Sequence, residues 1–317
     1  MRSALAATTA STRALAFCAC GLLLAQQGNL PSPPKAGATK PAWTIGIYTG
    51  PSAFQLSPPA GVTNPVLTAA AVHDMNVDTI AHPFMVVTGS HYYLFFTAKD
   101  AKTDKGGIGL AESRDGLEWK FRRTVLREPF VLAHPFVFQW RGVYYMIPEA
   151  HTQDSIRLYR AREFPDTWEF ETELLKGDTF ISPTLARFKN LWWMFVAPSG
   201  NETLRLFYAA ELKGPWTEHP RSPIVSKDLH AARPGGRPFV FEGILYRIGQ
   251  DCYPRYGYQV HAFQITDIST TTYAEKMIEI PLVKASAQGW NAQAMHHVDA
   301  QQIGKDTWLA AVDALGR

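Results

Sequence analysis

Five segments of the sequence repeat one pattern, and a repeat with a period near fifty residues constrains the fold more than any other feature. Each segment opens on a residue before Pro or His, continues as an apolar run and a short turn, and ends in a second run that opens on aromatic residues. AHPFVFQWRGVYYMI, residues 133–147, shows every part of the pattern. The five segments are residues 81–96, 133–147, 181–195, 236–248 and 295–311. Each predicts a pair of antiparallel strands joined by a turn.

Two more strands follow this pair in four of the units. Third strands are predicted over residues 107–113, 155–161, 203–209 and 258–264, and fourth strands begin at Trp119, Trp168, Trp216 and Tyr273. Four short strands to a unit are typical of the blades of a β-propeller. Five units therefore predict an all-β fold, a five-bladed β-propeller.

The ring needs a closing strand, because the last unit shows only two strands of its own. WTIGIYTG, residues 43–50, has no repeat partner. We expect this N-terminal strand to join the C-terminal blade, since closure of the ring removes exposed sheet edges. Residues 43–317 would then form one propeller domain.

The first 42 residues are predicted to lie outside the propeller. Residues 1–27 contain two arginines followed by an apolar run over residues 14–25, which is short for a membrane span and typical of a signal peptide. No Asp or Glu precedes Asp74, so an organellar transit peptide is the alternative. Residues 28–42 read as a Pro-rich linker. We expect a chain of the secretory pathway, secreted or in the cell envelope, with no transmembrane span once processed.

Charge and cysteine content narrow the function classes. Four of the 31 Lys and Arg residues precede residue 43, whereas all 28 Asp and Glu residues follow it, which leaves the propeller with a net charge near −1. This balance argues against a nucleic-acid partner. Cys18 and Cys20 lie in the leader, so Cys252 is alone and no intrachain disulfide is expected. We expect a monomer.

The residue that opens each first strand should face the channel of a propeller at one mouth. These residues are His82, His134, Ser182, Arg237 and His296. Three imidazoles at equivalent positions suggest substrate binding, although a strand-end histidine bonded to backbone is the structural alternative. Arg233 and Arg237 could grip a carboxylate or phosphate, or could brace their loop. Gln250, Tyr256 and His297 complete the candidate binding residues.

Carboxylates near the same mouth are the candidate catalytic acids and bases. Glu149 and Gln250 share one register, four residues after the second member of the Tyr144-Tyr145 or Leu245-Tyr246 pair. They should therefore point to the same mouth. Asp251 and Asp299 join Glu149 as the acid or base candidates, and structural hydrogen bonding is the alternative for each.

Several stretches together resemble a known family. They include WTIGIYTGPSAF, LYRAREFPDTW, GPWTEHPRSPI, RPGGRPFVFEGILYRIGQD and MHHVDA. These stretches resemble the N-terminal domain of plant glucosamine inositolphosphorylceramide transferases and its stand-alone microbial relatives. The resemblance implies a five-bladed propeller similar to family 43 and other furanosidase-type glycoside hydrolases. It also implies a carbohydrate context, with a glycan or glycolipid headgroup as partner.

The chain departs from the hydrolase pattern at its strand starts. Family 43 enzymes tend to carry three carboxylates at these positions in the first three blades, where this chain has His82, His134 and Ser182. Glycoside hydrolysis usually needs two carboxyl groups beside the bond. A hydrolase-like mechanism would therefore have to use Glu149 with Asp251 or Asp299.

Three functions remain open from the sequence. The first is a hydrolase-like, glycan-processing enzyme without a cofactor. The second is a non-catalytic propeller that recognises a glycan or sugar phosphate. The third is a metal-dependent enzyme in which His82, His134 and His296 bind a divalent transition metal, since three imidazoles with an open position suit Zn²⁺ or a similar ion.

Overall fold

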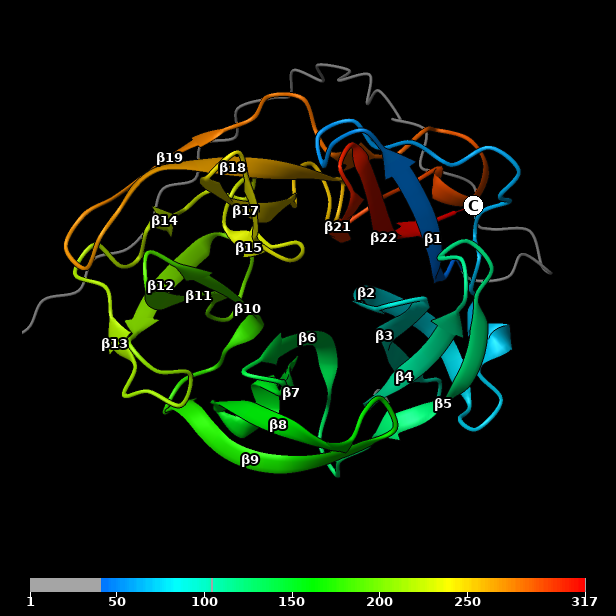
Figure 1. Ribbon diagram of the computed structural model, residues 1–317, viewed down its shortest axis with the longest axis horizontal. Helices are drawn as coiled ribbons and strands as arrows, with labels where there is room; N and C mark the ends of the chain where they lie inside the picture. Colours follow the sequence, from blue (N-terminus) through cyan, green and yellow to red (C-terminus); the bar gives the residue numbers. More distant parts are fainter. Residues whose placement is uncertain (1–40, 104, 317) are drawn as a thin grey trace, which may run out of the picture. The chain divides into compact units, whose positions relative to one another are not determined.

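The computed structural model describes residues 41–103 and 105–316, and residues from Pro41 onward form one compact unit. Five β-sheets follow one another around a ring, which confirms the predicted five-bladed β-propeller (Figure 1). The expected targeting peptide, residues 1–27, lies outside the described residues, as does the expected linker except for its last two residues. No helix of the described part is long and apolar enough to cross a membrane.

The first two blades have four antiparallel strands each. Blade 1 consists of β2 (Val77–Thr88), β3 (His91–Asp100), β4 (Gly106–Ser113) and β5 (Lys120–Leu126). Blade 2 consists of β6 (Ala133–Trp140), β7 (Val143–Glu149), β8 (Ser155–Glu163) and β9 (Thr167–Lys176), with a short 3-10 helix, η2 (His151–Gln153), after β7. These bounds agree with the repeat read from the sequence.

The next two blades are less regular at their outer edges. Blade 3 consists of β10 (Ile181–Phe188), β11 (Leu191–Ala197), β12 (Thr203–Ala209), β13 (Thr217–Glu218) and β14 (Val225–Ser226). Blade 4 consists of β15 (Arg233–Pro234), β16 (Phe239–Phe241), β17 (Ile244–Asp251), β18 (Gln259–Ile268), β19 (Tyr273–Met277) and β20 (Val283–Lys284). The inner strand of blade 4 is thus split in two by Gly235-Gly236, where the backbone approaches Val298.

Blade 5 closes the ring as predicted. It contains β21 (Val298–Gly304), β22 (Thr307–Leu315) and β1 (Trp43–Gly50), and β1 pairs antiparallel with β22 along its whole length. Figure 1 shows the two ends of the described chain side by side in this blade. Two further 3-10 helices, η1 (Ala69–Ala71) and η3 (Gly289–Asn291), lie in connecting segments.

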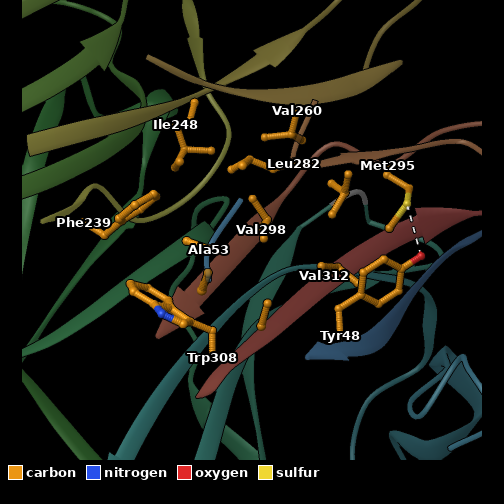
Figure 2. Close-up of a cluster of buried hydrophobic side chains, with 14 of the residues drawn as sticks. Tyr48, Ala53, Phe239, Ile248, Val260, Leu282, Met295, Val298, Trp308 and Val312 are labelled. Carbon is orange, nitrogen blue, oxygen red and sulfur yellow. Dashed lines mark hydrogen bonds between the residues drawn. The ribbon is translucent and has the colours of Figure 1, made fainter. Parts of the chain in front are cut away.

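The core of the described chain consists of five hydrophobic clusters, one between each pair of neighbouring blades. Figure 2 shows the cluster between blades 4 and 5, where Phe239 and Ile248 face Val298 and Trp308. The two residues of an aromatic pair pack into two different clusters, because successive side chains of a strand point to opposite faces of the sheet. Trp192 packs toward blade 2 and Trp193 toward blade 4. Strands buried on both faces explain why the repeat reads as continuous apolar runs.

Candidate functional site

The first residue of the repeated motif adopts an unusual backbone conformation in three blades. His82, His134 and Ser182 have φ angles of 51°, 46° and 51°. The strand pairing shifts register at the same places in β2, β6 and β10. The left-handed region costs a residue other than glycine roughly 1–2 kcal/mol, so the surrounding structure must hold these residues there. Such a bulge re-aims the side chain it carries.

A side chain of the preceding blade accepts a hydrogen bond from the amide of each bulge residue. In every case the acceptor stands near the end of that blade's second strand. The bonds join His82 N to Asp313 Oδ2 (2.8 Å), His134 N to Thr97 Oγ1 (2.9 Å) and Ser182 N to Glu149 Oε2 (2.8 Å). Neighbouring blades are therefore locked together at the mouth where the inner strands begin, which we call the strand-start mouth.

Asp313 and Thr97 are site residues that the sequence analysis missed, although a signal for them was present. Glu149 and Gln250 had been placed four residues after the second member of an aromatic or apolar pair. The same count from Leu309 reaches Asp313, and from Tyr93 it reaches Thr97. The register rule therefore also finds the acceptors of blades 1 and 5, and it identifies the second carboxylate of the mouth.

A cavity of about 300 Å³ opens at the strand-start mouth. Four predicted binding or catalytic residues line it, namely His82, Glu149, Tyr256 and His296. They are joined by Trp43, Thr97, Lys99 and His151, none of which the sequence singled out. The lining thus draws on blades 1, 2 and 5 and on the loop that carries Tyr256.

Aromatic rings form one wall of this cavity. Trp43, the first residue of β1, stacks on His296 with ring centroids 3.7 Å apart. His82 lies on the same imidazole at 4.7 Å, and Tyr256 meets it edge-on at 5.4 Å. Ring closure therefore does more than remove sheet edges, because it brings Trp43 to the site.

Glu149 is the most strongly anchored acid of the cavity. Its Oε2 accepts hydrogen bonds from Ser182 N and from Ser182 Oγ (3.3 Å), and Arg233 lies 3.8 Å away. Its Oε1 pairs with His151 Nδ1 at 3.0 Å. Burial by itself would raise the pKa of Glu149, but the bond with His151 and the charge of Arg233 outweigh it and lower the pKa. The carboxylate therefore stays ionised, and its hydrogen bond raises the pKa of His151.

Asp313 is the second carboxylate of the mouth and lies deeper. It is fully buried, and its Oδ1 lies 2.5 Å from His296 Nδ1. Burial raises the pKa of Asp313 and lowers the pKa of His296. The two carboxylate–imidazole pairs of the mouth thus differ in environment, since His151 is partly exposed and His296 is buried.

Four imidazoles gather in the channel at the cavity, those of His134, His296 and His297 buried and that of His82 half-buried. Burial lowers the pKa of all four, to about 3 for His82, so they are neutral near pH 7. In the described part of the chain, both ring nitrogens of His134 lack a hydrogen-bond partner. His134 and His297 are fully buried and do not line the cavity.

A metal site on His82, His134 and His296 was the third function that the sequence left open. Among residues 41–103 and 105–316, no group of three or more His, Cys, Asp or Glu side chains is placed to hold a metal ion. His82 and His296 lie nearly face to face, with 30° between their planes. Their Nδ1 atoms are engaged by Thr97 and Asp313. The arrangement of His82, His134 and His296 therefore differs from a three-imidazole ligand set.

Two of the predicted site residues, Arg237 and Asp299, lie away from the strand-start cavity. Arg237 borders a second cavity of about 430 Å³, at the other end of the inner strands, together with Met85 and Gln301, and Asp299 is buried beside it. Arg237 binds Asp299 through two hydrogen bonds of 2.7 and 3.1 Å, and Asp299 also accepts the amide of Met85 at 2.6 Å. The split inner strand of blade 4 explains the difference, since Arg237 does not adopt the left-handed bulge found in blades 1 to 3.

Three other candidates lie close to the mouth without lining its cavity. Asp251 is buried and bound by Tyr253 N, Gln259 Nε2 and His230 Nδ1, so its oxygens are occupied. Gln250 is buried, and its Oε1 has no partner among the described residues. Arg233 donates to Asn201 Oδ1 at 3.0 Å and faces Glu149, which makes it a support for that carboxylate. Cys252 is a buried free thiol.

Comparison with known proteins agrees with this architecture. A family 117 glycoside hydrolase from Zobellia galactanivorans superimposes with a TM-score of 0.52 and 16% identity, over 76% of this chain and 87% of that one. A thermostable family 43 glycoside hydrolase gives a TM-score of 0.50 and 14% identity, over 63% of this chain and 75% of that one. At identities this low, the comparison establishes the fold alone. The superpositions confirm the predicted likeness to family 43 propellers.

Sequence similarity is more specific. Glucosamine inositolphosphorylceramide transferase 1 of Oryza sativa subsp. japonica is 36% identical over 296 residues, which cover 86% of this chain and 40% of the relative. The homologue from Arabidopsis thaliana is 34% identical over a similar span. The chain thus spans about two fifths of the length of these curated relatives. The family model described as "Glucosamine inositolphosphorylceramide transferase 1, N-terminal" matches residues 37–315. The chain belongs to this family of N-terminal domains.

Proposed function

We propose that the strand-start mouth binds a carbohydrate, and that the chain recognises or processes a glycan there. The fold is shared with glycoside hydrolases, and the family relatives are named glucosamine inositolphosphorylceramide transferases. A glycan or glycolipid headgroup is therefore the proposed ligand. Because the chain covers two fifths of those relatives, their sugar transfer is not assigned to this domain.

The observation that carries this proposal is the composition of the 300 Å³ cavity. Trp43 and Tyr256 offer aromatic surface, and Glu149, His151 and Thr97 offer hydrogen-bonding groups beside it. Small-ligand sites commonly combine apolar and aromatic walls with a few fixed polar groups. A sugar ring presents an apolar face and a rim of hydroxyl groups, so its surface matches this combination.

Recognition without turnover is the second candidate. None of the five strand-start residues is a carboxylate, which is the feature on which ordinary glycosidase chemistry would depend. The two carboxylates of the mouth, Glu149 and Asp313, are both bound to bulge amides. A site of this kind could hold a sugar or sugar phosphate without cleaving it.

A binding experiment tests the proposal. The purified chain would be screened on an array of neutral and anionic oligosaccharides, and each hit would be measured by calorimetry. Trp43→Ala should weaken binding about tenfold or more, because stacking on an aromatic ring contributes on the order of 1 kcal/mol or more. Tyr253→Ala is the matched control, since Tyr253 is exposed and lines neither cavity discussed here. Binding that survives Trp43→Ala unchanged would contradict this placement.

The cellular setting belongs to the same proposal. We propose that residues 1–27 direct the chain into the secretory pathway, to be secreted or kept in the cell envelope, and that the mature chain is a monomer without a cofactor. Import into an organelle is the alternative. N-terminal sequencing of the protein recovered from each cell fraction would distinguish the two, and sedimentation would give the oligomeric state.

A further inference from the structure

We propose that His151 is the proton donor of the strand-start cavity, held in place by Glu149, and that the site hydrolyses glycosides. This inference rests on the proposed carbohydrate site and deepens it by assigning a reaction. An imidazole would take the part that a carboxylic acid plays in ordinary glycosidases.

The first step of the argument concerns Glu149. Its carboxylate sits beside the cavity, but Oε2 is occupied by the amide and hydroxyl of Ser182, with Arg233 3.8 Å away. Protonation would disrupt these contacts, so Glu149 is unsuited to give up a proton itself. Its other oxygen, Oε1, lies 3.0 Å from Nδ1 of His151 and forms a hydrogen bond with it. Glu149 is therefore a positioning residue for that imidazole.

The second step concerns the imidazole. His151 opens the 3-10 helix η2, two residues beyond Glu149, and its side chain is 37% exposed at the cavity. Since Nδ1 faces Glu149, Nε2 at the far edge of the ring is the nitrogen available to a ligand. Glu149 raises the pKa of His151, which favours an imidazolium near neutral pH. The charged groups that face the pair are Arg233 and, in the cavity lining, Lys99.

The third step is a base for the attacking water. His296 also lines the cavity, and its Nδ1 is held by the buried Asp313 at 2.5 Å. A buried carboxylate on Nδ1 fixes the orientation and tautomer of an imidazole, as in serine hydrolases, where Nε2 is the general base. The strand-start mouth thus contains two carboxylate–imidazole pairs, one with the partly exposed His151 and one with the buried His296. In many enzymes, different environments give two titratable groups different pKa values, so that one acts as the acid and the other as the base.

The proposed reaction consumes one water molecule and needs no other co-reactant. Water attacks the anomeric carbon and loses a proton to His296 Nε2. The bond from the anomeric carbon to the leaving oxygen breaks, and that oxygen receives the proton of His151 Nε2. The products are a free sugar and an alcohol. His296 then returns its proton to solvent and His151 takes one up, which restores the starting state.

A pair of substrates tests the role of His151. The native chain would be assayed on 4-nitrophenyl and methyl glycosides of α-L-arabinofuranose, β-D-galactopyranose and β-D-glucosamine. A methoxide leaving group needs a proton, whereas 4-nitrophenolate leaves readily without one. His151→Ala should therefore lower kcat/KM on a methyl glycoside by about 10²–10⁴, with a much smaller loss on the matching 4-nitrophenyl glycoside. The alkaline limb of the pH–rate profile should also disappear.

His230→Ala is the matched control, because His230 pairs with Asp251 through Nδ1 at the same 3.0 Å but lines no cavity described here. Its activity should equal that of the native chain. His151→Gln provides a second variant if alanine impairs folding. In addition, NMR titration should show the pKa of His151 falling in Glu149→Gln, which tests the positioning role without turnover.

The outcomes separate this inference from the proposed function. Equal losses on both leaving groups would indicate a structural role for His151 and overturn the assignment. Binding of sugars by the native chain without cleavage of any of the six glycosides would overturn hydrolysis and leave the carbohydrate site intact. Absence of any sugar binding would instead reject the proposed function on which the inference depends.

Discussion

Each mouth of the propeller channel has a carboxylate paired with a basic side chain, but the two pairs differ in how accessible they are to a ligand. At the strand-start mouth, Glu149 pairs with a partly exposed imidazole, His151, beside a cavity of about 300 Å³. At the other mouth, the larger cavity of about 430 Å³ is bordered by Arg237, whose charge is matched by two hydrogen bonds to the buried Asp299. The comparison teaches that cavity size is a poor guide to chemistry here. Titratable groups that remain available to a ligand are the better guide.

The largest expected effect is on the stability of the histidine-rich mouth in acid. Burial lowers the pKa of His82, His134, His296 and His297, so below pH 6.5 the unfolded chain binds protons that the native chain does not. Stability should therefore fall as the pH drops from 6.5 toward about 3, by up to roughly 1.4 kcal/mol per pH unit for each histidine. Urea denaturation at a series of pH values would measure this slope.

Replacing one of these histidines tests whether they cause the dependence of the unfolding free energy on pH. His134→Gln removes one titrating group whose ring nitrogens have no partner among the described residues. The slope below pH 6.5 should shrink by about a quarter or more, because Asp313, whose pKa is raised, reduces the net slope that the four histidines produce. A native chain equally stable at pH 6.5 and pH 4.5 would show that the histidines are not held neutral.

The second effect tests whether the opposite mouth is structural. Asp299→Ala leaves the guanidinium of Arg237 and the amide of Met85 without their acceptor. Breaking a buried ion pair from one side costs about 3–5 kcal/mol, and the lower figure fits because the Arg237 side chain is 16% exposed. Denaturant midpoints would show this loss, whereas sugar affinity at the strand-start mouth should not change.

A double replacement sharpens this result. Arg237→Met combined with Asp299→Leu removes both charges, and it should recover a large part of the lost stability because no unpaired charge remains. If Asp299→Ala instead abolishes sugar binding in a chain that is still folded, the roles assigned to the two mouths would have to be exchanged.

The smallest effect concerns the anchoring of Glu149. Ser182→Ala removes a 3.3 Å hydrogen bond from the hydroxyl group but keeps the 2.8 Å bond from the backbone amide. The expected change in the free energy of unfolding is about 1 kcal/mol or less. The pKa of His151, measured by NMR, should stay close to its native value. A large fall in that pKa would mean that the hydroxyl, rather than the amide, fixes the carboxylate.

Much of the fold could be predicted because its information is local. Each blade is specified by neighbouring stretches of chain, in which residue pairs such as Trp192-Trp193 supply one ring to each adjoining blade. The closing role of residues 43–50 followed from counting strands. The site was predicted less completely. His82, Glu149, Tyr256 and His296 do line one cavity. Arg237 lines the other cavity and binds the buried Asp299, and Trp43, His151 and Asp313 were missed.

By itself, then, the sequence determined the five-bladed propeller, its closure and its family resemblance, because packing between repeated strands is encoded within each repeat. Only the tertiary structure decided which polar groups meet. The bond from His82 N to Asp313 joins residues 231 positions apart, and the stacking of Trp43 on His296 also spans nearly the whole chain. Such contacts exist only once the ring has closed. Their distances, together with burial from both sides, set the charge states on which the chemistry of the mouth depends.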